Sequence, residues 1–122
     1  MDLIIGGAYQ GKRAFAENTL GIPGEGVYTC TGSNIDFSKP CIDRLEEFTL
    51  ACVREGKDPL EILKGQDLSE KTLICMDVFC GVVPIDPELR QWRQVTGLVC
   101  QYLAARASRV YRIFCGLEQR LK

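Results

Sequence analysis

The chain has 122 residues, of which 46% are hydrophobic and 25% are charged, so we expect one domain over residues 1–122 rather than a disordered segment. The formal net charge of -1 is too balanced to imply a nucleic-acid or anionic-membrane partner for the whole chain, so the total charge does not identify a partner. No apolar run reaches the roughly 18 residues of a membrane span, and no basic start with an apolar stretch marks a signal peptide, so we expect a cytoplasmic protein without a membrane span.

The first third of the sequence predicts a strand, a turn, a helix and a second strand. Residues 2–7 form a short apolar stretch that ends in two glycines, as expected of a buried strand, and residues 11–19 are compatible with a helix. After a segment rich in glycine and proline, the β-branched and aromatic residues 27–30 predict a second strand. Residues 31–38 are polar and are expected to form a loop.

The next segment predicts a helix. Ser38 can cap a helix that has Pro40 in its first turn, and apolar residues then recur at helical spacing up to Gly56. These apolar residues are Ile42, Leu45, Phe48 or Thr49, and Cys52. Three acidic residues of the same helix are expected to face solvent: Asp43, Glu46 and Glu47.

A short helix and a buried strand are expected to follow. Asp58 and Pro59 open the helix, which ends near Lys64. Residues 72–76 are apolar without polar alternation, which is typical of a strand covered on both faces. This strand ends at Asp77.

The last third predicts the longest helix and a final strand. Asp86 is a suitable N-cap, Pro87 takes the first helical position, and the apolar stripe continues for about five turns. Residues 109–114 then predict the last strand, closed by Gly116. Strands that alternate with helices in this way indicate an α/β fold with a mostly parallel central sheet and helices on both faces.

A phosphate-binding loop is the main functional signal. It fits the pattern G-x-x-x-x-G-K and stands between a predicted strand and a predicted helix, which is the context that the motif requires. Backbone N–H groups of such a loop surround phosphates, and the lysine reaches the terminal ones. The residues of the pattern are Gly6, Gly7, Ala8, Tyr9, Gln10, Gly11 and Lys12. The alternative interpretation is a glycine-rich turn without a ligand.

Two further residues bear on metal binding. The position after the lysine usually carries Ser or Thr, whose hydroxyl helps to coordinate Mg²⁺, but Arg13 stands here and a guanidinium cannot ligate a cation. Asp77, at the end of an apolar strand, resembles the carboxylate on the metal side of phosphate-loop enzymes, although strands often end in Asp as a turn residue. The sequence therefore predicts Asp77 as the metal ligand and departs from the usual Mg²⁺ site at Arg13.

The cysteines and the missing histidines exclude other chemistry. The seven cysteines include no CxxC pair, and the sequence has no histidine, so we do not expect a zinc site. We expect the cysteines to be buried, reduced thiols that act as small apolar residues. Without histidine, an imidazole base or a phosphohistidine intermediate is excluded.

Three stretches, residues 4–17, 77–84 and 92–122, form a combined pattern. The first contains an apolar strand, Gly-Gly-Ala, Gly-Lys and an alanine-rich helix; the second reads Asp-Val-Phe-Cys-Gly-Val-Val-Pro. The third contains Trp-Arg, Gln-Tyr-Leu-Ala-Ala and a terminal lysine. Together they resemble the adenosylcobinamide kinase and adenosylcobinamide-phosphate guanylyltransferase family of cobalamin biosynthesis, although the middle of this chain is too short for the full family pattern.

The resemblance implies a phosphate-loop NTPase-like fold of three layers, with ATP or GTP and Mg²⁺ as cofactors. It also implies that adenosylcobinamide is a candidate binding partner and that the protein forms a homo-oligomer. It implies catalytic roles for Lys12 and Asp77, a phosphate contact from Arg13, and a ligand contact from Arg93. The family transfers guanylyl groups through a histidine, so kinase-type phosphoryl transfer is the expected reaction here. The alternative is a noncatalytic nucleotide-binding or assembly relative.

A basic C-terminal segment raises a third class of function. Residues 90–122 contain seven basic residues and only one acidic residue, Glu118. These basic residues are spread around a predicted helix and strand rather than along one stripe, so we interpret them as a solvated surface and expect no nucleic-acid partner.

Overall fold

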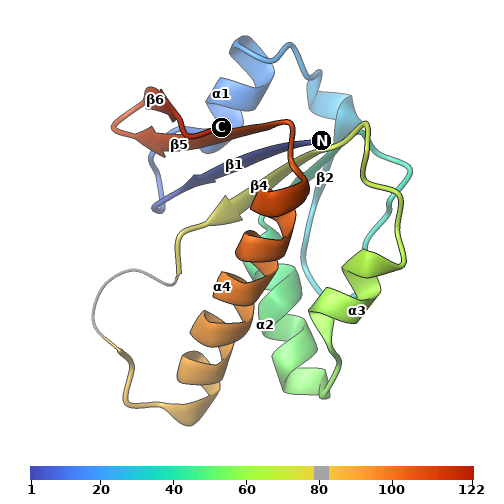
Figure 1. Cartoon of the computed structure of the whole chain (residues 1–122), viewed down its shortest axis with the longest axis vertical. Helices are drawn as coiled ribbons and strands as arrows, with labels where there is room; N and C mark the ends of the chain where they lie inside the picture. Colours follow the sequence, from blue (N-terminus) through green and yellow to red (C-terminus); the bar gives the residue numbers. More distant parts are fainter. Residues whose placement is uncertain (79–82) are drawn as a thin grey trace.

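The computed structural model describes residues 1–78 and 83–122, which form one mixed sheet with helices on both of its faces (Figure 1). The strands are β1 (Asp2–Gly6), β2 (Val27–Thr29), β3 (Cys41–Asp43), β4 (Thr72–Met76), β5 (Arg109–Phe114) and β6 (Leu117–Arg120). The helices are α1 (Lys12–Asn18), α2 (Leu45–Glu55), α3 (Pro59–Lys64) and α4 (Pro87–Arg106), with a 3-10 turn at Gly24–Gly26. The α/β class of the protein is thereby confirmed.

The sheet is parallel except at one end. Its strand order within the described residues is β2-β3-β4-β1-β5-β6, and only the β5–β6 pair is antiparallel. Because β1 lies in the middle and pairs with β4 and β5, the segment that follows β1 emerges at the centre of the carboxyl edge. This is the edge at which open α/β sheets bind their ligands.

Two groups of buried side chains hold the helices on the sheet. On one face, α2, α3 and α4 pack together over the sheet through Leu45, Phe48, Leu63, Val99 and Leu103. On the other face, Phe15 and Ala16 of α1 pack against alternate residues of the central strands, which include Ile4, Ile74 and Ile113. The strands are thus covered on both sides, as their uninterrupted apolar sequences predicted.

Most predicted elements are confirmed, but the helix expected to begin near Ser38 is wrong at its start. Residues 41–43 form β3, which pairs with β2 and β4, and α2 begins only at Leu45. Arg44 separates the two elements with a left-handed backbone, φ +57°, which no helix can contain. The apolar spacing was helical, but pairing with two neighbouring strands decided the structure of the first residues.

The strand at residues 109–114 is confirmed, but it is not the last one. Cys115 and Gly116 form a two-residue turn with φ values of +52° and +74°, and β6 returns antiparallel to β5. Positive φ at both residues is the property of turns that match the twist of a hairpin.

The predicted N-cap of α4 is confirmed. The Asp86 carboxylate accepts a hydrogen bond from the Glu88 N–H at 2.8 Å.

The buried residues of the central strands agree with the sequence, with one exception. Ile4, Leu73, Ile74 and Ile113, which belong to apolar stretches of the sequence, are at most 1% exposed. Ile5 is only partly buried and packs at the margin of the core. Across the described residues, no helix combines the length and the apolarity needed to cross a bilayer.

Gly6 is the position where a side chain would disturb the sheet most. A Cβ there would lie 2.5 Å from the Ile113 carbonyl oxygen, so the β5 backbone would have to move. We expect Gly6→Ala to lower the free energy of unfolding by about 1–3 kcal/mol, measured by urea denaturation. Gly24→Ala is the matched control, because a Cβ at Gly24 meets no heavy atom within 4 Å. An equal free energy of unfolding for the two variants would show that the β5 backbone can move without destabilising the protein.

Candidate functional site

The glycine-rich loop and Asp77 lie at the same edge of the sheet. The loop leaves β1 at Gly6, and Asp77 follows the neighbouring parallel strand β4. The Asp77 N–H donates a 2.8 Å hydrogen bond to the Gly6 carbonyl oxygen. The loop and Asp77 therefore lie next to each other at the carboxyl edge of the sheet.

A cavity of about 890 Å³ opens between this loop, α1, β3 and the start of α2. Its wall contains most of the glycine-rich loop together with charged residues from other elements. The lining residues are Ala8, Tyr9, Gln10, Gly11, Lys12, Arg13, Ala14, Glu17, Asp43, Arg44, Glu46 and Met76. This is large enough for a nucleotide-sized ligand.

Lys12 is the central cation of the cavity. It is half-buried, and its Nζ donates a 2.6 Å hydrogen bond to the Gly7 carbonyl oxygen, so the side chain folds back across the loop. Burial lowers the pKa of Lys12, whereas the nearby carboxylates of Glu46 and Asp43 act in the opposite direction. Among the hydrogen bonds of the described residues, none is donated by the backbone N–H groups of Ala8, Tyr9, Gly11 or Lys12. The loop therefore offers a cation and several N–H donors to an anion.

Arg13 is held by two carboxylates rather than pointing at the loop. Its Nε donates to Glu17 Oε1 at 2.8 Å, one turn further along α1, and its Nη1 donates to Asp43 Oδ2 at 3.3 Å. Arg13 therefore links α1 to the end of β3. Its positive charge is partly compensated before any ligand enters.

Asp43 and Glu46, which the sequence assigned to a solvated face, are buried beside Lys12. Asp43 is 8% exposed and Glu46 is 4% exposed, so that assignment is wrong for both, whereas Glu47 is half-buried. The cause is the strand β3, which places Asp43 at the carboxyl edge and turns the first residues of α2 toward the loop. One feature of the sequence could have indicated the position of Asp43. Ile42-Asp43 is an apolar residue followed by Asp, like Met76-Asp77 at the end of the predicted strand 72–76.

Glu46 keeps its buried carboxylate through specific contacts. Its Oε1 accepts the Met76 N–H at 2.8 Å, and its Oε2 lies 3.9 Å from Arg44 Nε. The contact with Met76 ties the start of α2 to the end of β4, next to Asp77. A buried carboxylate is stable only with such partners, so Glu46 is part of the framework of the cavity as well as one of its charges.

Gln10 fixes the shape of the loop from its outer side. Its carbonyl oxygen accepts the Gly116 N–H at 2.9 Å, and its side-chain oxygen accepts the Cys115 N–H. Gly11 has φ +97°, and a Cβ there would lie 3.4 Å from the Gly116 Cα. The loop thus rests against the β5–β6 turn, and Gln10 acts as a positioning residue there.

Four predicted site residues do not line the cavity: Gly6, Gly7, Asp77 and Arg93. Asp77 lies at its margin, where its Oδ1 is buried and has no hydrogen-bond partner among the described residues. Arg93 belongs to α4 and is not among the lining residues. The second stretch of the family-like pattern falls partly outside the described residues, because these exclude 79–82 and with them Cys80.

The charges of the cavity balance. Its three cationic side chains, Lys12, Arg13 and Arg44, face three carboxylates, Glu17, Asp43 and Glu46. The described residues contain no group of three His, Cys, Asp or Glu side chains that could hold a metal ion. A Mg²⁺ ion bound together with phosphates needs only one or two carboxylates. Asp43, at the end of β3, and Asp77, directly after β4, are the candidates at the carboxyl edge of the sheet.

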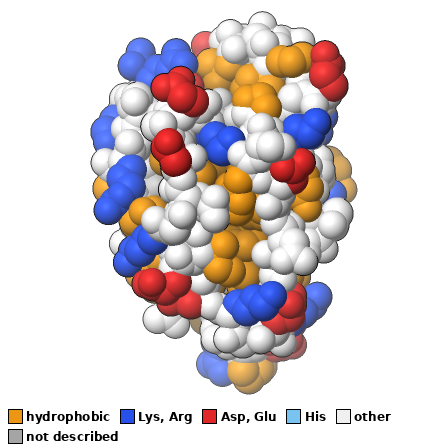
Figure 2. Space-filling model, turned by 90° about the vertical axis from the view of Figure 1, so that its right-hand side faces the viewer, with side chains coloured by type: hydrophobic (Ala, Val, Ile, Leu, Met, Phe, Trp, Pro, Cys, Tyr) orange, Lys and Arg blue, Asp and Glu red, His pale blue; other side chains and the backbone are white. Residues whose placement is uncertain are grey.

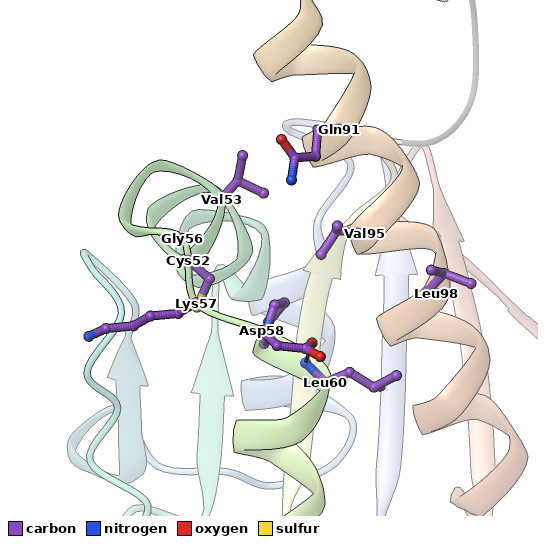
Figure 3. Close-up of a pocket in the computed structure, with 10 residues that line it drawn as sticks. Cys52, Val53, Gly56, Lys57, Asp58, Leu60, Gln91, Val95 and Leu98 are labelled. Carbon is purple, nitrogen blue, oxygen red and sulfur yellow. Dashed lines mark hydrogen bonds between the residues drawn. The ribbon is translucent and has the colours of Figure 1, made fainter.

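A second hollow lies between α2, α3 and α4 (Figure 3). Its wall is largely apolar, with Val53, Leu60 and Val95, and the Lys57 side chain extends away from it. Lys57 pairs with Glu55, and the Asp58 carboxylate caps α3 by accepting the Leu60 N–H. The two charged residues of this hollow, Lys57 and Asp58, are therefore engaged in contacts within the protein.

One face of the molecule also bears on the nucleic-acid interpretation. Figure 2 shows apolar side chains along the middle of this face, with basic and acidic side chains interspersed on either side. This face therefore carries no continuous basic stripe of the kind that follows a phosphate backbone.

No protein-family model matches this chain, and no curated protein does either.

Proposed function

We propose that the cavity binds the phosphates of ATP or GTP and that the protein is a kinase of cobalamin biosynthesis or salvage that phosphorylates adenosylcobinamide. The observation that carries the phosphate-binding part is Lys12, a half-buried cation in a glycine-rich loop. The N–H groups of Ala8, Tyr9, Gly11 and Lys12 in this loop donate no hydrogen bond to another described residue. The purine nucleotide and the corrinoid substrate rest on the sequence resemblance alone.

In this proposal the chain contributes positioning and charge. Lys12 exchanges the Gly7 carbonyl oxygen for a phosphate oxygen, and the loop N–H groups bind the remaining phosphate oxygens. Mg²⁺, when bound together with the nucleotide, would supply positive charge next to the phosphates. Asp77, whose Oδ1 is buried without a partner among the described residues, is the residue that would hold that ion, through a water molecule.

One observation favours the noncatalytic alternative. Arg13 occupies the position of the usual hydroxyl ligand and also engages Asp43, the cavity carboxylate at the end of β3. An ion pair at that position competes with Mg²⁺ for the carboxylate. A protein that binds nucleotide without turnover is therefore the second candidate function.

Calorimetry tests the binding proposal directly. We expect ATP or GTP to bind, GDP to bind more weakly, and the nucleosides adenosine and guanosine to show no heat of binding, because the site recognises phosphates. Each titration is run with and without Mg²⁺. Equal binding of nucleosides and triphosphates would place recognition outside the loop, and no binding of any nucleotide would leave the loop as a structural turn.

The variant Arg13→Ser separates the two candidate functions. Serine supplies a hydroxyl ligand and releases Asp43 from its ion pair, so we expect Mg²⁺-dependent transfer of phosphate to adenosylcobinamide to increase. Arg54→Ser is the control for charge, since Arg54 pairs with Glu88 on the helical face, outside the cavity. Nucleotide binding without phosphoryl transfer in both the natural chain and Arg13→Ser would favour the noncatalytic protein.

A further inference from the structure

The free edge of β6 has the backbone and side-chain pattern of a self-pairing strand. β6 ends the sheet, and all four of its residues are exposed. The Leu121 N–H donates to the Val110 carbonyl oxygen of β5 at 2.8 Å. Because backbone groups alternate in direction along a strand, Leu117 and Gln119 also face β5. The N–H and C=O groups of Glu118 and Arg120 therefore point away from the sheet.

We propose that two copies of the protein associate through β6, antiparallel about a two-fold axis at Gln119, to form one continuous sheet. In this register each Glu118 lies opposite the partner's Arg120, and each Arg120 lies opposite the partner's Glu118. Two cross-strand ion pairs thus form alongside the new backbone hydrogen bonds. This proposal is independent of the nucleotide proposal.

The charges select this register among those that the backbone allows. Outward-facing backbone groups of one β6 strand can pair only with outward-facing groups of the other. The allowed registers therefore pair Glu118 and Arg120 with each other or with themselves. Moving the axis to Glu118 places the two Glu118 carboxylates opposite each other, and moving it to Arg120 places the two guanidinium groups together. Only the axis at Gln119 pairs opposite charges at both positions.

The apolar side chains agree with the same register. Leu117 and Leu121 are 73% and 52% exposed, and they lie on the face of the sheet that carries Val110 and α4. With the axis at Gln119, each Leu117 lies opposite the partner's Leu121. Phe114, which is 65% exposed and pairs with Leu117, borders this contact. Association therefore covers apolar surface that the single chain leaves in water.

The Glu118 and Arg120 side chains are available for these pairs. Glu118 forms no ion pair within the described residues, and Arg120 donates only its Nε, to the Lys122 carbonyl oxygen at 2.9 Å. The two terminal nitrogens of the guanidinium remain for the partner's carboxylate. A four-residue strand buries less than a standard interface, so we expect a weak dimer that forms between about 10 µM and 1 mM protein.

Charge reversal tests the interface. In analytical ultracentrifugation the natural chain should shift from monomer to dimer as its concentration rises, whereas Glu118→Arg alone and Arg120→Glu alone should remain monomeric. The double variant E118R/R120E restores opposite charges and should regain the dimer. Circular dichroism of each variant confirms that it is folded.

Amide hydrogen exchange supplies a second readout with an internal control. The N–H groups of Glu118 and Arg120 should exchange more slowly at 1 mM than at 10 µM protein, while that of Gln119, already bonded to β5, should change little. A natural chain that stays monomeric at 1 mM, a dimer insensitive to single reversal, or a folded double variant that stays monomeric would each overturn the proposal.

Discussion

Replacing Lys12 by alanine is expected to weaken binding of nucleoside triphosphate about tenfold to 150-fold, which corresponds to about 1.5–3 kcal/mol for a charge-assisted hydrogen bond. Lys12 is the cation of the loop itself, and its Nζ lies 2.6 Å from the Gly7 carbonyl oxygen. The loss should appear in the dissociation constant measured by calorimetry. It should be smaller for a diphosphate, which offers fewer oxygens to the ammonium group.

The control for this variant is Lys64→Ala. Lys64 lies on α3, outside the cavity, and pairs with Glu61, so its removal changes the net charge equally without touching the loop. A Lys12→Ala chain that binds triphosphate as tightly as the Lys64→Ala chain would make Lys12 a structural residue that only holds the Gly7 carbonyl. The phosphate-binding proposal would then lose its main support.

Alkaline pH is expected to destabilise the protein strongly through two buried thiols. Burial raises the pKa of Cys30 and of Cys41 from 9.0 to about 12. Above pH 9 the unfolded chain loses these protons while the folded chain keeps them. The two thiols therefore do not lower the free energy of unfolding below pH 9, and they lower it increasingly as the pH rises toward 12. At pH 10.5 each thiol lowers the free energy of unfolding by about 2 kcal/mol, or about 4 kcal/mol together.

This prediction is measured by urea unfolding at pH 8 and pH 10.5 in a phosphine reductant. Tyrosine and lysine also titrate in this range, so the informative quantity is the difference between variants. Cys30→Ala and Cys41→Ala should each lose about 2 kcal/mol less between the two pH values than the natural chain. Cys115→Ala removes an exposed thiol and serves as the control. Identical pH dependence in all four chains would contradict burial of Cys30 and Cys41.

Local sequence was sufficient for the elements whose signals lie within a few residues. The long helix α4 has its own N-cap at Asp86, proline at its first position and a continuous apolar stripe, so its position did not depend on the rest of the chain. The loop from Gly6 to Lys12 was likewise predicted together with its neighbouring strand and helix. Its place at the carboxyl edge followed because parallel strands point the same way.

Tertiary structure decided the elements that have no such local signal. β3 is three residues long and shares its apolar positions with a helical pattern, so only its pairing with β2 and β4 makes Cys41–Asp43 a strand. The polar sequence Leu-Glu-Gln-Arg of β6 becomes a strand because a two-residue turn brings it back onto β5. Backbone hydrogen bonds between distant segments outweigh the weak preferences of such short sequences.

The same division holds for the candidate site. The sequence by itself determined the glycine-rich loop, its lysine, the departure at Arg13 and the absence of histidine, because these depend on residue type and local order alone. Only the tertiary structure brought Asp43 and Glu46, more than 30 residues away, into the wall beside Lys12 and left Arg93 outside it. A charged side chain can be buried only where the fold places suitable partners around it. For Glu46 these partners are the Arg44 guanidinium, which is close in sequence, and the Met76 N–H, which the fold brings from a distant strand.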